Sequence, residues 1–159
     1  LLVRGSSASG VVEYERDAAG RIIRTSYPEE RVVIDRAYGE AGLLIDLEIP
    51  LLDVSIEHVW SGAGRLRSVA LNGRSVLGVE YDKAGREAVR VTPGIGAVLR
   101  SYDSLGRPSA AVFRDPGRVA RQAVVYGYTE GGRLAGELLS DGSGKLYRYD
   151  RTGGLHQTL

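Results

Sequence analysis

The stretch "YDKAGRE", residues 81–87, returns almost unchanged as "YDSLGRP" at residues 102–108. A catalytic loop is usually present once in a domain, whereas a structural unit can be present many times. Similarity at a fixed period of about 20–50 residues is typical of repeat architectures. The two copies therefore indicate a repeated structural unit rather than a single loop that carries chemistry.

Seven stretches share a template in which an aromatic residue precedes a glycine by four positions. Successive glycines lie 22, 22, 21, 21, 26 and 21 residues apart, and one insertion around "FRDPGRVARQ" (113–122) accounts for the long interval. The first copy has Arg16 where an aromatic residue is expected. The copies are "RDAAGRI" (16–22), "YGEAGLL" (38–44), "WSGAGRL" (60–66), "YDKAGRE" (81–87), "YDSLGRP" (102–108), "YTEGGRL" (128–134) and "YDRTGGL" (149–155).

Each copy has the residues of a β-hairpin tip. Aspartate at the first turn position and glycine at the fourth are typical of a type I turn, in which the carboxylate accepts hydrogen bonds from backbone N–H groups. The glycine takes the left-handed conformation, which gives a common hairpin loop with a bulge. The predicted turn residues are Asp17, Gly20, Gly42, Gly64, Tyr81, Asp82, Gly85, Arg86, Tyr102, Asp103, Gly106, Arg107, Tyr128, Gly132, Tyr149, Asp150 and Gly153. Asp82 and Arg86 should face each other as an opposite-charge pair.

The segments between the tips have the composition of strands. Valine, isoleucine and tyrosine dominate "VVEYE" (11–15), "RIIRTSY" (21–27), "RVVIDRAY" (31–38) and "LLIDLEI" (43–49), which favours β-structure. Asn72–Gly73 is a strong signal for a tight return turn. The sequence predicts an all-β fold, a continuous antiparallel meander of about fourteen short strands in hairpin repeats of about 21 residues. Residues 114–123 fit a short helix or an irregular loop.

Composition argues against several functions. The chain has 159 residues, 43% of them hydrophobic, and its net charge of +1 gives no basic field that would attract nucleic acid. The absence of cysteine excludes a disulfide scaffold and a cysteine nucleophile. No apolar run approaches the roughly 18 residues of a membrane helix, and His58 and His156 lie outside any metal-ligand spacing. No catalytic residue, cofactor or metal is therefore expected.

The repeated side chains have structural interpretations and functional alternatives. The tyrosines are predicted to pack against neighbouring strands, with stacking on a sugar as the alternative. The arginines are predicted to pair across the strands, with anion binding as the alternative. Asp46 and Glu48 alternate with Leu47, so the carboxylates should share one face of a strand and the apolar residues the other.

The motifs "YRYDRTGGL" (147–155), "YGYTEGGRL" (126–134) and "YDSLGR" (102–107) resemble the YD repeat, or Rhs repeat, of Rhs toxins, Tc-toxin shell components, WapA-like proteins and teneurins. The resemblance implies a large curved or spiralling β-sheet that closes as a hollow shell. In the bacterial toxins such a shell encloses a toxic polypeptide. Seven repeats should form an open segment of that shell. The self-cleavage motif of the family is not evident, because "RDPGRV" (114–119) has Asp115–Pro116 without the remainder.

The resemblance implies a structural scaffold. Residues 1–159 are predicted to be one YD-repeat sheet segment of a longer chain, with no second domain. The implied partners are neighbouring repeats of the same protein and an enclosed toxin or effector polypeptide, and the implied location is secreted or at the cell surface of a bacterium. The alternative is a carbohydrate- or cell-wall-binding module with a glycan partner, which the single tryptophan disfavours. A sheet that crosses an outer membrane is a third hypothesis, disfavoured because such strands run about 9–11 residues.

Overall fold

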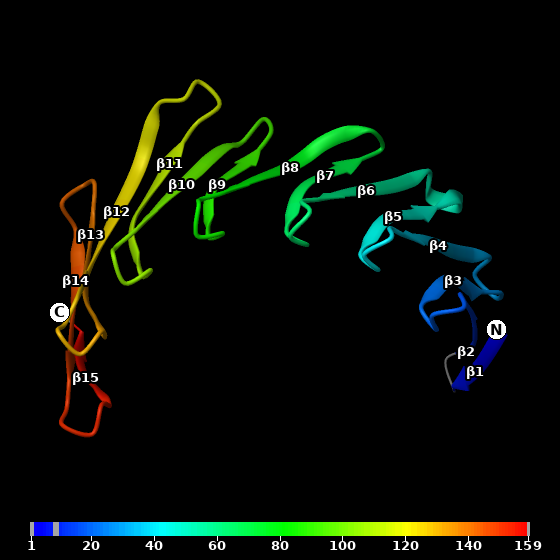
Figure 1. Cartoon of the computed structure of the whole chain (residues 1–159), viewed down its shortest axis with the longest axis horizontal. Helices are drawn as coiled ribbons and strands as arrows, with labels where there is room; N and C mark the ends of the chain where they lie inside the picture. Colours follow the sequence, from blue (N-terminus) through cyan, green and yellow to red (C-terminus); the bar gives the residue numbers. More distant parts are fainter. Residues whose placement is uncertain (1, 8–9, 159) are drawn as a thin grey trace. The chain divides into compact units, whose positions relative to one another are not determined.

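The computed structural model describes residues 2–7 and 10–158, and their side chains from residue 10 to residue 155. The described part consists of strands joined by short turns, with one short 3-10 helix (Figure 1). The strands are β1 Leu2–Ser7, β2 Gly10–Arg16, β3 Ile22–Tyr27, β4 Val32–Tyr38, β5 Leu44–Ile49, β6 Val54–Trp60, β7 Leu66–Leu71, β8 Arg74–Tyr81, β9 Glu87–Thr92, β10 Gly96–Tyr102, β11 Pro108–Arg114, β12 Ala120–Tyr128, β13 Leu134–Leu139, β14 Gly144–Tyr149 and β15 Leu155–Thr158; the helix is η1 Pro50–Leu52.

The chain divides into two compact units, Leu1–Gly78 and Val79–Leu159. Within each unit the strands follow the order of the sequence, and each strand is hydrogen-bonded to the one before and the one after it. The strand pairs with a described register are antiparallel, as in the pairing of Thr25 with Ile34 or Leu99 with Val112. The predicted all-β antiparallel meander is confirmed. The described part contains fifteen strands rather than fourteen, because "LVRGSS" (2–7) forms β1 despite its polar and small residues.

Residues 114–123 form neither a helix nor an irregular loop. The backbone N–H of Asp115 donates to the carbonyl oxygen of Val119 at 3.0 Å, and that of Arg118 donates to Asp115 at 2.8 Å. This closes a tight return turn, and β12 begins at Ala120. The insertion inferred from the repeat spacing is therefore taken up by a five-residue turn and by β12, which has nine residues.

The two faces of the first unit differ in chemistry. Residues that pair directly in an antiparallel sheet share a face, so the pairing of Leu47 with Ile56 builds an apolar face. The opposite face brings Asp46 opposite Glu57 and Asp35 opposite Glu48. The separation of carboxylates from apolar residues along β5 follows the predicted alternation. The Arg24 guanidinium pairs with Asp35 through two hydrogen bonds, of 2.6 and 3.1 Å, and so offsets part of the like-charge repulsion.

One face of the second unit carries a continuous series of aliphatic residues. The register joins Val89 to Leu99, Leu99 to Val112, and Val112 to Ala123. It continues through the pairing of Val125 with Leu138. This surface is called the aliphatic face below. Its residues include Val89, Val91, Ala97, Leu99, Ala110, Val112, Ala123, Val125, Gly136, Leu138, Gly144 and Leu146.

Burial in this fold is shallow. Among the described side chains, Val79 is the one buried hydrophobic residue, at 6% exposure, and Thr25 is the one buried polar residue. Thr25 accepts a hydrogen bond from Arg36 at 2.8 Å. Within each unit, the described strands lie in one sheet rather than in the two packed layers that usually enclose a core. The stability of each unit therefore rests on ladder hydrogen bonds and cross-strand side-chain pairs. No helix in the described part of the chain has the length and apolar character of a membrane span.

Candidate functional site: the repeated hairpin tips

The seven tips share one backbone geometry. In each tip the N–H of the first residue donates to the carbonyl of the fifth at 2.8–3.0 Å, and the N–H of the fourth donates to the carbonyl of the first at 2.8–3.1 Å. The fourth residue is always glycine with positive φ, from 70° at Gly64 to 93° at Gly153. The predicted glycines lie in these positions: Gly20, Gly42, Gly64, Gly85, Gly106, Gly132 and Gly153.

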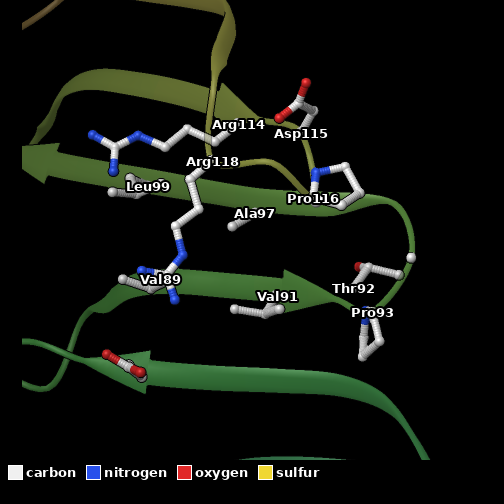
Figure 2. Close-up of a pocket in the computed structure, with 13 residues that line it drawn as sticks. Val89, Val91, Thr92, Pro93, Ala97, Leu99, Arg114, Asp115, Pro116 and Arg118 are labelled. Atoms are coloured by element: carbon white, nitrogen blue, oxygen red, sulfur yellow. The ribbon is translucent and has the colours of Figure 1, made fainter.

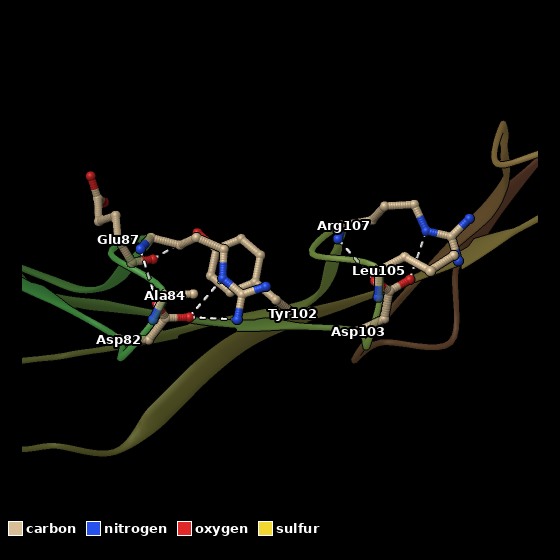
Figure 3. Close-up of polar contacts among 8 residues, drawn as sticks. Asp82, Ala84, Glu87, Tyr102, Asp103, Leu105 and Arg107 are labelled. Atoms are coloured by element: carbon tan, nitrogen blue, oxygen red, sulfur yellow. Dashed lines mark hydrogen bonds and ion pairs between the residues drawn. The ribbon is translucent and has the colours of Figure 1, made fainter.

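An aspartate side chain completes the tip wherever the first residue is aspartate. In the fourth tip, Oδ1 of Asp82 accepts from the N–H groups of Ala84 and Arg86, both at 2.9 Å. Its Oδ2 accepts from Nε of Arg86 at 2.7 Å. Asp103 makes the same contacts one repeat later (Figure 3). One carboxylate therefore satisfies turn N–H groups and holds the arginine of its own tip.

Two of the predicted aspartates repeat this arrangement in whole or in part. Asp17 caps the N–H groups of Ala19 and Arg21 and pairs with the Arg21 guanidinium. Asp150 accepts from the N–H groups of Thr152 and Gly154 and from the Thr152 hydroxyl at 2.7 Å. The last tip has Gly154 at the fifth position, where the other tips that begin with aspartate have arginine, so its aspartate caps the turn without holding a guanidinium.

The arginine of one tip contacts the tyrosine of the next repeat. The guanidinium carbon of Arg86 lies 4.4 Å from the centre of the Tyr102 ring, and that of Arg107 lies 4.3 Å from the Tyr128 ring. Arg21 over Tyr38 and Arg133 over Tyr149 repeat the contact at 4.7 and 5.3 Å. Such cation–π contacts are attractive, by about 0.5–1 kcal/mol at exposed sites. Successive hairpins are thus joined by side chains as well as by the backbone ladder.

The tyrosine hydroxyl adds a second connection to the preceding hairpin. Tyr102 donates to the carbonyl of Glu87 at 2.8 Å, Tyr128 to that of Pro108 at 2.7 Å, and Tyr149 to that of Leu134 at 2.9 Å. We call the aspartate, its arginine and the tyrosine of the next repeat the tip clamp. Tyr81 ends β8, directly before the fourth tip. The link between consecutive tips was not anticipated from the sequence.

Trp60 takes the tyrosine position in its repeat and keeps the same connection. Its Nε1–H donates to the carbonyl of Leu44 at 2.7 Å. We expect Trp60→Tyr to retain a donor near this carbonyl. Trp60→Phe removes the donor and should lower the free energy of unfolding by about 1 kcal/mol more, the usual contribution of one such bond. Urea unfolding of the two variants measures the difference, and equal stabilities would refute the importance of this hydrogen bond.

Three tips depart from aspartate at the first position. Ser61 and Thr129 substitute a hydroxyl oxygen, which accepts from the N–H of Arg65 at 3.2 Å and of Arg133 at 3.1 Å. Gly39 has no side chain, and its tip keeps only the backbone hydrogen bonds to Leu43 and Gly42. The feature that all seven tips share is therefore the conformation of the backbone, and a side chain caps the turn in six of them.

Sequence reasoning missed one capped turn on the return side of the sheet. Asp115 Oδ1 accepts from the N–H of Val119 at 3.0 Å, and its Oδ2 accepts from Nε of Arg121 at 2.7 Å. Arg118 occupies the fourth position with φ of 64°, where the tips have glycine. The signal was the aspartate followed by proline, since proline favours the second position of a type I turn.

The capping hydrogen bonds lower the pKa of the aspartates. The N–H of Arg86, followed by its guanidinium, holds the pKa of Asp82 below its ordinary value of 3.8. At Asp103, desolvation raises the pKa, but the N–H and the guanidinium of Arg107 outweigh it, and the net pKa is also lowered. A carboxyl group with a lowered pKa in the folded state stabilises that state fully above its unfolded pKa. This contribution is lost as the pH falls through the lower, folded value.

Stability should therefore depend on these aspartates in a pH-dependent way. We expect the double variant Asp82→Asn/Asp103→Asn to have a lower thermal midpoint than the wild type at pH 7. The difference should shrink as the pH falls below 3.8, the ordinary pKa, because the carboxyl groups then take up protons first in the unfolded chain and, at still lower pH, in the folded wild type. Thermal unfolding at a series of pH values measures this difference. A difference that is independent of pH would show that the charged form does not cap these tips.

The described side chains show no cluster of three or more histidine, aspartate or glutamate residues that could hold a metal ion. His58 stacks on Trp60 with ring centres 6.3 Å apart, and its Nδ1 has no hydrogen-bond partner among the described residues. The side chain of His156 lies outside the described side chains. The capping carboxylates and hydroxyls of the tips form hydrogen bonds within their own tips, and these bonds stabilise the turns.

Comparison with known proteins finds similarity in structure only. No protein-family model matches the sequence, and no curated protein matches it. The solved structure of TcdB2-TccC3 without the hypervariable C-terminal region superposes with a TM-score of 0.82 at 15% identity, over 98% of this chain and 9% of that chain. The Tc holotoxin pore of Photorhabdus luminescens, in a TccC3 mutant form, gives 0.80 at 14% identity over the same shares. TcdB2-TccC3 itself gives 0.79 at 14% identity, over 94% of this chain and 9% of that chain.

These likenesses establish the fold. The chain has a Rhs-repeat-like fold over nearly its whole length, which confirms the YD-repeat resemblance predicted from the sequence. It spans about 9% of the length of the chains that it resembles.

Proposed function

We propose that this chain is a structural YD-repeat scaffold, one segment of a shell that encapsulates or presents a toxin or effector polypeptide of an exported bacterial protein. Residues 1–159 form a single repeat segment of a longer chain in this proposal, without a second domain. Its role is mechanical: it holds a wall together and performs no catalysis. The predicted tip residues are accordingly structural.

The tip clamp is the observation that carries this proposal. A wall one sheet thick cannot rely on a buried core, and Val79 is the one buried hydrophobic residue among the described side chains. Each hairpin must therefore gain its stability from its neighbours, as in other repeat proteins. The contacts of Arg86 with Tyr102 and of Arg107 with Tyr128 provide that coupling at successive tips.

The structural likeness supports the same proposal. The chains that it resembles belong to Tc toxin complexes, and the superposition includes almost all of this chain. The partners that follow are neighbouring repeats of the same protein and an enclosed polypeptide. Export to the cell surface or the medium follows from the resemblance.

Glycan binding is less well supported by the tips. Sugar recognition by stacking needs an aromatic face that is open to the ligand. The rings of Tyr38, Tyr102, Tyr128 and Tyr149 each have an arginine guanidinium over one face, and their hydroxyls donate to the preceding hairpin. The repeated aromatic residues are thus occupied in holding hairpins together.

The proposal can be tested in the full-length protein to which this segment belongs. Electron cryo-microscopy should show these repeats in the wall of a hollow shell, and the enclosed polypeptide should resist a protease. Gly85→Val, which should weaken the wall, should make that polypeptide sensitive, whereas Gly62→Val should not. A full-length protein without an enclosed volume, together with binding on a glycan array, would contradict the shell and support the carbohydrate module.

A further inference from the structure

The second unit contains a hollow of about 650 Å³ over the aliphatic face. Its floor is formed by Val89 and Val91 of β9 and by Ala97 and Leu99 of β10. The return turn that contains Pro116 borders it, and Figure 2 shows Pro116 beside the strand that carries Ala97. Val91 is 38% exposed, so the floor offers apolar surface to a ligand.

Two arginines without partners border this hollow. Arg114 ends β11 and Arg118 lies in the return turn, and both are exposed. Within the described part of the chain, neither guanidinium forms a hydrogen bond, an ion pair or a ring contact, in contrast to Arg86 and Arg107 at the tips. Figure 2 shows the Arg118 side chain extending across the floor toward Val89. The hollow therefore combines an apolar floor with free positive charge.

The neighbouring acidic groups do not neutralise this charge. Asp115 lines the hollow, but its carboxylate accepts from Arg121 and from the N–H of Val119. Glu80 also lines the hollow from β8, and the strand order places it at the opposite border from Arg114 of β11. An anion beside the two arginines is consequently favoured over a cation.

The aliphatic face continues beyond the hollow. The register carries it from Leu99 to Val112 and from Val112 to Ala123. It ends at a second hollow of about 470 Å³, whose lining includes Val125, Leu138 and Leu146. These side chains are 54%, 57% and 58% exposed. A surface of this length suits an extended polypeptide better than a compact small molecule, because alternate side chains of one strand can rest along it.

We propose that the hollow and the aliphatic face bind an extended polypeptide segment with acidic residues at one end and aliphatic residues at alternate positions after them. The acidic end pairs with Arg114 and Arg118, and the aliphatic residues lie on Val91 and Leu99. Guanidinium groups pair well with carboxylates, in part through two parallel hydrogen bonds. This proposal depends only on the residues of this face. It is therefore independent of the proposed role in a shell.

Fluorescence anisotropy with a labelled peptide tests this site on the 159-residue chain. The probe has two glutamates followed by alternating leucine and serine. Matched peptides replace the glutamates by glutamine or by lysine. The acidic peptide should bind about fivefold more tightly than the glutamine peptide, as expected for two exposed ion pairs of modest strength. The lysine peptide should bind most weakly.

Variants of the chain show which of its side chains bind the peptide. The double variant Arg114→Gln/Arg118→Gln should weaken binding of the acidic peptide about fivefold and leave the glutamine peptide unchanged. Val91→Thr should weaken both peptides, because it makes the floor polar at nearly constant volume. Arg151→Gln removes an exposed arginine from the last tip, away from the hollow, and should change nothing. Thermal midpoints close to that of the wild type establish that the variants are folded.

Two results would overturn the proposal. One is an acidic peptide that binds the double arginine variant as tightly as the wild type. The other is tightest binding of the lysine peptide, which would place recognition at Glu80. Because the probe is added to the isolated segment, either result leaves the proposed shell untouched.

Discussion

Replacing Gly96 by alanine is expected to lower the free energy of unfolding by roughly 2–5 kcal/mol, through backbone strain and a steric clash that act together. Gly96 begins β10 with φ of 142°, a conformation that other residues adopt only with strain. A Cβ atom there would fall on the backbone carbonyl oxygen of Arg114 and within 2.9 Å of Cε2 of Phe113. A carbonyl within a hydrogen-bonded ladder cannot move aside easily, so β10 and β11 would have to separate.

Two matched substitutions divide this effect into its causes. Gly94→Ala adds a methyl group at φ of 78° where nothing lies within 4 Å, so it reports strain without a clash. Gly62→Ala adds one where neither strain nor contact is present. Urea unfolding should rank the stabilities as Gly62→Ala, then Gly94→Ala, then Gly96→Ala. A Gly96→Ala protein as stable as Gly94→Ala would show that β11 does not approach Gly96 so closely.

Replacing Gly85 by valine is also expected to lower the free energy of unfolding substantially. Gly85 closes the fourth tip with φ of 77°, and a β-branched residue tolerates positive φ poorly. We expect a loss of about 1–3 kcal/mol, which corresponds to a fall of roughly 2–12 °C in the thermal midpoint of a chain of this size. Gly62→Val in the preceding tip controls for the side chain itself. An unchanged midpoint for Gly85→Val would mean that the turn assignment is wrong.

The tips could be predicted because their structure is local. Aspartate at the first position and glycine at the fourth determine a turn over five residues, and the Asp82–Arg86 pair follows from that turn alone. The contact of Arg86 with Tyr102 could not be predicted in the same way. It depends on the register and the bulges that set how far one hairpin lies from the next, and these are properties of the assembled sheet.

The return turn at 115–119 shows a second limit. Residues 114–123 were predicted to form a short helix or an irregular loop, because "DPGRV" has arginine where the tips have their fourth-position glycine, the residue that most readily adopts positive φ. The structure gives that conformation to Arg118, with φ of 64°. Pro116 fits the second position of the turn, which leaves Arg118 at the fourth, the position that glycine occupies in the tips. The hollow that this turn borders could therefore not be predicted from the sequence pattern.

The division of the chain into faces was predicted only in part. Alternation along β5 separated Asp46 and Glu48 from Leu47, because side chains of a strand alternate between faces. The continuous aliphatic face of the second unit required the pairing of Leu99 with Val112 and of Val125 with Leu138. The sequence pattern of each strand shows which of its residues share a face, but it does not show which face of the next strand lies on the same side of the sheet.

The central claim is that successive hairpins hold one another through the tip clamp, and a double-mutant cycle between Arg86 and Tyr102 tests it most directly. Arg86→Gln, Tyr102→Leu and the double variant are compared by urea unfolding. The loss of the Asp82 pair occurs in both backgrounds and cancels. The clamp predicts a favourable coupling of about 0.5–1 kcal/mol, whereas Arg151→Gln combined with Tyr102→Leu should be additive. Additive effects for Arg86 and Tyr102 as well would contradict the account.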